Sequence, residues 1–380
     1  MSGMLKFAQR AAVWAALPAA LACAGCAPLA PLPSRADLAP TVTLPLSMSG
    51  VADERRLFAA LFAQELRAGA AARIGDDSWL HRAPPGADDR GDRLAVIATA
   101  FAARGAATSV LLLPGLFGDC FDTQSVPFGD GVTRSRERSL TEAYRQYDDL
   151  GLQGIRSLPL PGRAASIENG RVVADAIRSE AARPGVGRIV LVAYSKGVAD
   201  ALHALALLQA QGGVPASVTA LVAVAGVVMG TPFADHFERV FEDLSPLVQP
   251  FDCSPSDGRE VASVTRRERV AWLAANPPPA GLRYYSIVAH APRDEIGLAL
   301  QPFHAAMSAY DLRNDGQLYA SDTVLPGSTL LAEARADHWD VALPRDRHPN
   351  AAMRALTSGR GYPREALFRA TIKWVVGSEP

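Results

Sequence analysis

The sequence feature that most constrains the fold is an abrupt change of apolar period between residues 188 and 208. Ile189 to Val192 are four consecutive apolar residues, three of them β-branched, which is typical of a strand buried on both faces of a parallel sheet. After Gly197 the apolar residues recur at helical spacing, at Val198, Ala201, Leu202, Leu205 and Leu208. The pattern predicts a strand that turns directly into a helix, with Ser195 at the turn.

This turn has the pattern of a nucleophile elbow. In such a turn a serine is pushed clear of the sheet edge and faces the helix N-terminus, so the residues two before and two after it must be small. Here they are Ala193 and Gly197, with alanine in place of the usual first glycine. A serine in an ordinary strand-to-helix loop is the alternative, because a short pattern with one mismatch does not exclude it.

Strands and helices alternate through most of the chain. Further strands are predicted at Ser109–Leu113, Val218–Val224 and Leu282–Ala289, and helices at 53–68, 94–104, 166–182 and 363–376. Alternation of this kind predicts an α/β fold with a mostly parallel central sheet and helices on both faces.

Composition agrees with a globular chain and excludes one class of partner. Of the 380 residues, 49% are hydrophobic and 20% are charged, which is enough apolar material for a sizeable core. The formal net charge is −1, so the chain lacks the basic excess of a nucleic-acid-binding protein.

The N-terminus has the pattern of an export signal over residues 1–25. Lys6 and Arg10 precede the apolar stretch Ala11–Ala24, which is too short to span a bilayer. The sequence C-A-G-C that ends at Cys26 resembles a bacterial lipobox, which predicts cleavage before Cys26 and its lipidation. A plain signal peptide that is cut nearby is the alternative. The protein is expected to be exported to the periplasmic face of the cell envelope and anchored there at Cys26.

Behind this signal we predict a proline-rich tether over 26–50 and one α/β domain over 51–380. A helical insertion at 233–280 interrupts the alternation between two predicted strands. Thr265 and Glu268 form a capping box for its second helix. Such an insertion is either a lid over an active site or a helical decoration that is packed permanently on the core.

An activated serine needs a base within hydrogen-bond reach and an acid that orients the base. His338 lies in a loop 23 residues after Asp315, and Asp315 occupies a tight Asn-Asp-Gly turn. Asp294, which follows the strand that ends at Ala289, is the other candidate for the acid.

Six short motifs occur in the order found in the secreted bacterial triacylglycerol lipases of the α/β-hydrolase fold, which the chain resembles from about Ser109 to Pro344. The motifs are P-G-L at Pro114–Leu116, A-Y-S-K-G at Ala193–Gly197, G-T-P at Gly230–Pro232, Y-Y-S at Tyr284–Ser286, N-D-G-Q-L at Asn314–Leu318 and H-W-D at His338–Asp340. Pro114 stands where the family has a loop histidine, but that side chain takes no part in the family's chemistry.

The resemblance implies a serine hydrolase of the esterase or lipase type that acts on an ester or lipid substrate. Ser195 is implied as nucleophile, Asp315 as acid and His338 as base, with the backbone N–H groups of Leu116 and Lys196 as the oxyanion hole. The side chain of Lys196 is expected to reach solvent. An acyltransferase or polyester depolymerase with the same triad is an alternative, and so is a catalytically silent envelope binding protein.

No cofactor or metal is predicted. Asp340 matches a residue that helps to bind structural calcium in the lipases, but the sequence shows no sure second ligand. Once Cys26 is lipidated and the signal is removed, Cys120 and Cys253 are the remaining cysteines. A lone pair of cysteines in an oxidising compartment predicts a disulfide, here between the oxyanion loop and the insertion, and two separate buried thiols are the alternative.

Overall fold

The computed structural model describes residues 38–41, 49–69, 77–84, 90–118, 124–130, 132–133, 142–236, 259–348 and 350–378. The signal segment, most of the tether and both Cys120 and Cys253 lie outside these residues. Lipidation of Cys26 and the disulfide therefore stay predictions.

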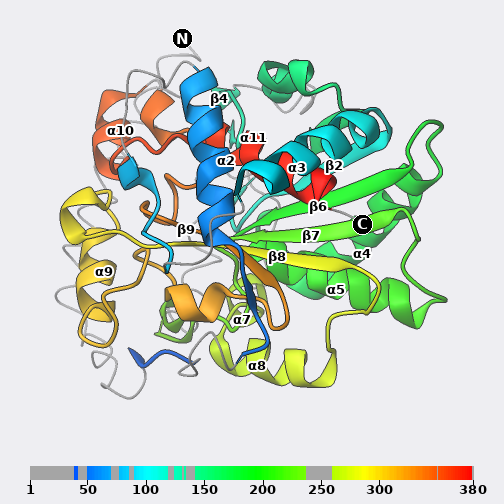
Figure 1. Cartoon of the computed structure of the whole chain (residues 1–380). Coiled ribbons are helices and arrows are strands. Elements are labelled where there is room, and N and C mark those ends of the chain that lie inside the picture. The colour runs from blue at the N-terminus through cyan, green and yellow to red at the C-terminus, as the bar shows by residue number, and fades with distance from the viewer. Residues whose placement is uncertain are drawn as a thin grey trace, which may run out of the picture.

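A seven-stranded sheet in the order β1-β9-β8-β7-β6-β2-β5 forms the centre of the molecule (Figure 1). All of its neighbouring strands pair in parallel. The strands are β1 (Ala52–Asp53), β2 (Thr108–Leu113), β5 (Gly154–Ser157), β6 (Arg188–Tyr194), β7 (Val218–Val224), β8 (Arg283–Ala289) and β9 (Thr329–Ala334). Because the strands are parallel, the loops that follow β2, β6, β8 and β9 leave the sheet at the same edge. A separate antiparallel pair joins β3 (Gln124–Ser125) to β4 (Val132–Thr133).

Helices cover both faces of the sheet (Figure 1). On one face lie α2 (Arg55–Ala68), α3 (Arg90–Arg104) and α11 (Arg364–Gly377), and on the other lie α4 (Ser166–Ala181) and α5 (Lys196–Ala210). The shorter helices are α7 (Arg259–Ala262), α8 (Arg266–Ala275), α9 (Gln301–Met307) and α10 (Ala351–Thr357). The 3-10 helices are η4 (Asp77–Trp79), η5 (Gly105–Ala107), η6 (Glu142–Leu150), η7 (Arg293–Glu295), η8 (Ala320–Thr323) and η9 (Arg345–Arg347).

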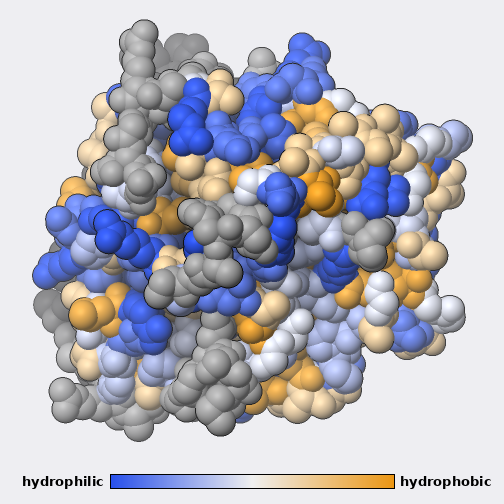
Figure 2. Space-filling view, in the orientation of Figure 1, coloured by the Kyte–Doolittle hydropathy of each residue, from blue (hydrophilic) through white to orange (hydrophobic). Residues whose placement is uncertain are grey.

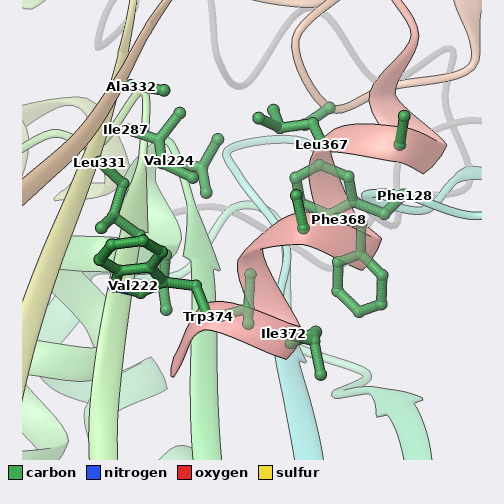
Figure 3. Packing of buried hydrophobic residues seen from close by; sticks show 14 of the residues in the cluster. Phe128, Val222, Val224, Ile287, Leu331, Ala332, Leu367, Phe368, Ile372 and Trp374 are labelled. Carbon is green, nitrogen blue, oxygen red and sulfur yellow. The ribbon is translucent and has the colours of Figure 1, made fainter. Parts of the chain in front are cut away.

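Both faces of the central strands are buried, as their continuous apolar runs predict. Side chains alternate along β2, so that Val110 and Leu112 pack under α2, α3 and α11 while Leu111 and Leu113 pack under α4 and α5. On the first face, Trp374 of α11 belongs to the same buried cluster as Val222 of β7, and Figure 3 shows its ring pointing toward the strands. The Trp374 ring meets Phe58 edge to face at a centroid distance of 6.0 Å. Burial of each such large side chain stabilises the fold by about 1.5–3 kcal/mol.

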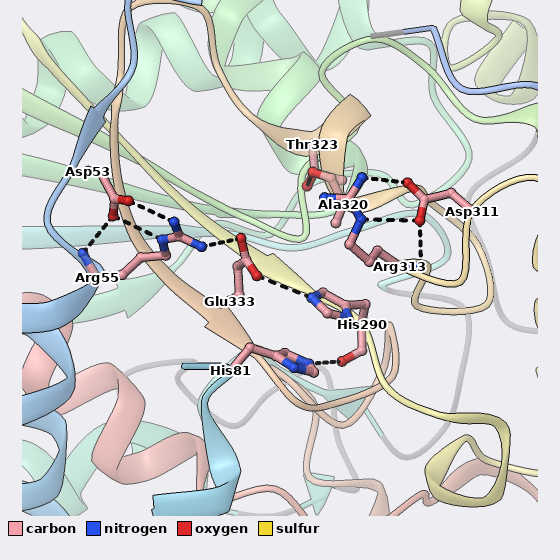
Figure 4. Close-up of polar contacts among 9 residues, drawn as sticks. All are labelled: Asp53, Arg55, His81, His290, Asp311, Arg313, Ala320, Thr323 and Glu333. Carbon is pink, nitrogen blue, oxygen red and sulfur yellow. Dashed lines mark hydrogen bonds and ion pairs between the residues drawn. The ribbon is translucent and has the colours of Figure 1, made fainter. Parts of the chain in front are cut away.

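The predicted fold class is confirmed, and the four predicted helices begin and end within four residues of their expected bounds. The strands β1, β5 and β9 were not predicted, although the carboxyl end of β9 precedes His338 in the chain. Glu333 of β9 forms part of a chain of polar contacts with residues from other segments (Figure 4). Arg55 forms ion pairs with Glu333 Oε1 and with Asp53. The other carboxylate oxygen of Glu333, Oε2, lies 3.4 Å from His290 Nε2. His81 donates to the His290 carbonyl at 3.0 Å, and the two imidazoles stack at 3.7 Å.

The described half of the insertion packs firmly on the core. Thr265 caps α8 and accepts a hydrogen bond from the Glu268 N–H, as the capping box predicts. Val261 and Val264 form a buried cluster with Val227, and Arg269 of α8 is fully buried. Buried side chains therefore join this half of the insertion to the core. Residues 237–258 lie outside the described part of the chain.

Hydrophilic and hydrophobic residues alternate across the face that Figure 2 shows. Within the described residues, none of the helices has both the length and the apolar character that crossing a membrane requires.

Candidate active site

Ser195 occupies the turn between β6 and α5 in a strained backbone conformation. Its φ of 54° and ψ of −127° lie where residues with a side chain seldom occur, and such strain is typical of functional turns. Gly197 explains why the turn is possible, since a Cβ there would lie 2.6 Å from the Leu113 carbonyl oxygen and 2.7 Å from that of Pro114. Ala193, by contrast, lies in the buried strand in register with Leu113, and its methyl group is accommodated in the core.

The structure brings Ser195, His338 and Asp315 into one hydrogen-bonded chain. His338 Nε2 lies 2.9 Å from Ser195 Oγ, and His338 Nδ1 lies 2.7 Å from Asp315 Oδ2. The three residues are 7%, 2% and 0% exposed, respectively. A carboxylate at Nδ1 selects the tautomer with the proton on Nδ1, and Nε2 is then free to accept the serine hydroxyl proton.

Asp315 is held by its own turn. Its Oδ1 accepts hydrogen bonds from the N–H groups of Gln317 at 2.8 Å and Leu318 at 2.7 Å, which leaves Oδ2 to face the imidazole. The His338 N–H also donates to the Asp315 carbonyl at 2.9 Å, so backbone and side chain are fixed together. Asp294, the other candidate acid, is exposed on η7. Among the described residues it is Asp315, not Asp294, that hydrogen-bonds the imidazole.

Tyr194, which precedes the serine, supports the histidine from the other side. Its hydroxyl donates to the His338 carbonyl at 2.7 Å, and its ring lies 5.3 Å from the imidazole. Burial raises the pKa of Tyr194 well above its usual value, so the phenol remains a proton donor. The sequence did not predict this contact, although Tyr194 lies inside the elbow motif.

The loop after β2 passes directly over the serine. A Cβ on Gly115 would lie 2.9 Å from Ser195 Cβ, so only glycine allows the loop to approach this closely. Leu116 follows in this loop, and Lys196 is the first residue of α5. Within the described part of the chain, neither backbone N–H donates a hydrogen bond. Two free donors beside a serine hydroxyl are able to bind a negatively charged oxygen.

The side chain of Lys196 contradicts the expectation that it reaches solvent. It is 1% exposed, and its Nζ donates to Asp200 Oδ1 at 2.7 Å. A lysine in the first turn opposes the helix macrodipole, and Asp200 one turn later offsets that cost. The spacing of four residues was the signal in the sequence that could have predicted this buried pair.

Asp337 and Asp340 form a buried carboxyl pair on either side of His338. Asp337 Oδ2 accepts from the Gly297 N–H, and Asp340 Oδ2 accepts from the N–H groups of Gly359 and Gly361. These backbone N–H donors therefore occupy Oδ2 of Asp340, which is not available as a calcium ligand. Across the described residues, no group of three or more His, Cys, Asp or Glu side chains is arranged to hold a metal. Burial and the Asp340 carboxylate raise the pKa of Asp337 to about 8.

Comparison with known proteins finds the same fold in solved structures of a carboxyl esterase and a lipase. No protein-family model matches the chain, and no curated protein does. Among solved structures, the metagenomic carboxyl esterase MGS0156 is 28% identical with a TM-score of 0.71, over 92% of this chain and 99% of that one. The mature lipase BlEst2 of Bacillus licheniformis is more distant, with 18% identity and a TM-score of 0.47 over 70% of this chain and 92% of its own. The protein therefore has the α/β-hydrolase fold, in a form that it shares with a carboxyl esterase over nearly the whole length of both chains.

Proposed function

We propose that the protein is a serine hydrolase that cleaves carboxylic esters through an acyl-enzyme. The observation that carries this proposal is the unbroken hydrogen-bond chain from Ser195 Oγ through His338 to Asp315. The similarity to a carboxyl esterase over 92% of the chain supports it. A catalytically silent envelope protein is disfavoured, because such a protein has no need for a strained serine with a matched base and acid.

In the proposed reaction, Ser195 Oγ attacks the ester carbonyl carbon while His338 Nε2 takes the hydroxyl proton. The carbonyl oxygen becomes an anion and is bound by the N–H groups of Leu116 and Lys196. The tetrahedral intermediate then breaks the bond to the alcohol, which leaves with the proton from His338. A water molecule then attacks the acyl carbon while His338 Nε2 takes one of its protons. The bond between the acyl carbon and Ser195 Oγ breaks, Oγ takes the proton back from His338, and the carboxylic acid is released.

We further propose an ester or lipid substrate at the cell envelope, where the protein is exported and anchored through a lipid on Cys26. The reaction needs no cofactor, and a nucleic-acid partner is not expected at a net charge of −1. An acyltransferase or polyester depolymerase would use the same triad. An acyltransferase differs from an esterase in the acyl acceptor, which is an alcohol and not water, and a polyester depolymerase differs in the ester that it cleaves.

The test is Ser195→Ala, assayed with p-nitrophenyl esters and with a fluorophosphonate probe. We expect kcat to fall on the order of 10⁶-fold, because the nucleophile is lost, and labelling to disappear. Ser286→Ala is the matched control, since this buried serine of β8 hydrogen-bonds Ser328 and not His338.

Each other outcome selects among the alternatives. Ester hydrolysis near the wild-type rate in Ser195→Ala would overturn the assignment. A wild type that neither hydrolyses esters nor takes the label would identify the silent binding protein. Preferential transfer of the acyl group to an added alcohol over water would identify an acyltransferase.

A further inference from the structure

A buried polar network begins at the side chain of Lys196, directly behind the nucleophile. Lys196 Nζ donates to Asp200 Oδ1 at 2.7 Å, and the other oxygen of Asp200 accepts from Asn169 Nδ2 at 2.8 Å. Asn169, on α4, also donates to the carbonyl of Pro161 at 3.1 Å. The three side chains are 1%, 1% and 2% exposed. The network therefore links α5 through α4 to the segment that ends at Pro161.

The same segment holds the loop after β2. Gly162, the residue after Pro161, accepts a hydrogen bond at its carbonyl from the Phe117 N–H at 2.9 Å. Phe117 follows Leu116 and has a φ of 60°, a left-handed conformation that a phenylalanine adopts only when its surroundings impose it. The segment is itself tied to the end of β2, because the Leu158 N–H donates to the Leu112 carbonyl at 2.8 Å.

A continuous path thus joins the two proposed halves of the oxyanion hole. It starts at Lys196, whose backbone N–H forms one half, and runs through Asp200 and Asn169 to Pro161. From there it continues through Gly162 to Phe117, whose neighbour Leu116 supplies the other half.

The surroundings of the network leave it little freedom to move. On the α4 side, a Cβ on Gly170 would lie 2.7 Å from His203 Cβ, so α4 and α5 are in close contact. From the insertion, the buried Arg269 of α8 is attracted to Asp200, donates to the Val228 carbonyl and lies 4.8 Å from the Trp272 ring centroid. Each oxygen of the Asp200 carboxylate thus has its own partner, Lys196 for one and Asn169 for the other, which favours a single arrangement of the carboxylate.

We propose that Lys196, Asp200 and Asn169 are positioning residues that set the spacing between the two N–H donors of the oxyanion hole. This inference rests on the proposed ester hydrolysis. None of the three side chains touches the substrate. They act through the backbone of Lys196 on one side and through Pro161–Gly162 and the loop of Leu116 on the other. A misplacement of about 1 Å in a catalytic group is enough to reduce the rate about 100-fold.

The variant that isolates this role is Asn169→Leu. Leucine has the same branched arrangement of side-chain heavy atoms, with two methyl groups in place of the smaller amide oxygen and nitrogen. It breaks the path between Asp200 and Pro161 while it leaves the Lys196–Asp200 ion pair in place. We expect kcat for p-nitrophenyl esters to fall about 10- to 100-fold with KM within about twofold, because donors in the wrong position weaken only the charged intermediate. The inhibition constant of an alkyl trifluoromethyl ketone should rise by a similar factor, since its adduct with Ser195 places an oxyanion in the hole.

The matched control is Ser109→Ala. Ser109 lies at the start of β2, at the opposite end of that strand from the oxyanion loop, and donates to the buried Glu180 of α4. The control breaks a buried hydrogen bond of the same helix, α4, but on a part of the helix outside the proposed path, so it should lower the melting temperature with kcat unchanged. Asn169→Ser is a milder variant in which a water molecule can replace part of the amide, and it should lose at least about threefold in kcat.

A purely structural network would give a different result. In that case Asn169→Leu and Asn169→Ser would have lower melting temperatures but the kcat and the ketone affinity of the wild type. If Ser195→Ala is inactive, this result would overturn the positioning role and leave the proposed ester hydrolysis in place. An active Ser195→Ala would instead overturn the proposed function.

Discussion

At the scale of single residues, Asp315 shows how a side chain is aimed by its own backbone. Two backbone N–H groups of the turn donate hydrogen bonds to Oδ1 of Asp315. These bonds fix the carboxylate so that Oδ2 points toward His338. Asp294 has no comparable constraint and is exposed on η7. The arrangement favours Asp315 as the acid because orientation of the imidazole depends on a fixed acceptor.

We expect Asp315→Asn to reduce kcat about 10³- to 10⁴-fold, because an amide at this position favours the wrong tautomer of His338. Asp294→Asn, the matched control, should stay within about twofold of the wild type. Steady-state kinetics with p-nitrophenyl esters measure both. If Asp294→Asn is the more damaged enzyme, the acid is Asp294 and the motif alignment is wrong at this point.

At the scale of elements, Asp337 and Asp340 fasten three loops to one another. The loop after β9, which carries His338, is joined to Gly297 after β8 and to Gly359 and Gly361 after α10. A Cβ on Gly359 would lie 2.9 Å from Asp337 Oδ2 and 3.1 Å from Asp340 Oδ2, so both carboxyl groups gather at one glycine. The pair holds one proton at neutral pH, because burial and its neighbour raise the pKa of Asp337 to about 8.

This raised pKa makes stability depend on pH. Between the ordinary aspartate pKa of 3.8 and about 8, the folded protein binds a proton that the unfolded chain has released. The stabilising contribution is therefore complete below about pH 4 and is lost as the pH rises toward 8. Asp340→Asn removes the like charge and keeps an oxygen for the glycine N–H groups. Between pH 5 and pH 9, the free energy of unfolding should fall less in Asp340→Asn than in the wild type. The two decreases should differ by about 1.4 kcal/mol or more, which is the equivalent of one pKa unit.

Urea denaturation at pH 5, 7 and 9 measures this difference, with Asp294→Asn as the control for loss of an exposed carboxylate. Parallel pH profiles in the wild type and Asp340→Asn would show that the two carboxyl groups do not share a proton.

At the scale of the whole molecule, the N-terminal segment reaches the domain beside the candidate active site. Thr41 donates to Asp322 Oδ2 at 3.0 Å, and Tyr319, four residues after Asp315, donates to the Leu38 carbonyl. Leu38 follows Cys26 by twelve residues, which span at most about 40 Å when fully extended. A lipid on Cys26 would therefore keep Leu38, which contacts the segment after Asp315, within about 40 Å of the membrane surface.

The prediction for the anchor is that Cys26→Ser leaves the protein exported but found in the soluble fraction. The lipoprotein modification supplies several acyl chains, and attachment by more than one chain is firm. Cys23→Ser is the matched control, since Cys23 would leave with the signal, and it should remain in the membrane fraction after a carbonate wash. Wild-type protein in the soluble periplasm would contradict the prediction.

The sequence by itself determined four adjacent strands of the sheet, β2, β6, β7 and β8, the larger helices and the class of fold. Continuous β-branched runs such as Ile189–Val192 specify buried parallel strands, and the change to helical spacing after Gly197 specifies the turn at Ser195, because both signals are local. The turn of Asp315 is likewise encoded within five residues. Its distance to His338 is not local, but the order of six motifs along the chain was enough to predict the pairing of acid and base.

Only the tertiary structure decided which polar side chains meet. The strand β9 has a short and mixed sequence and is a strand because β8 pairs with it. The burial of Lys196 depends on α4 packing against α5, and the path from Asn169 to Phe117 joins residues that no periodic pattern connects. Such contacts form where separate elements approach one another, so the free energy of the assembled fold selects them, and no single segment encodes them.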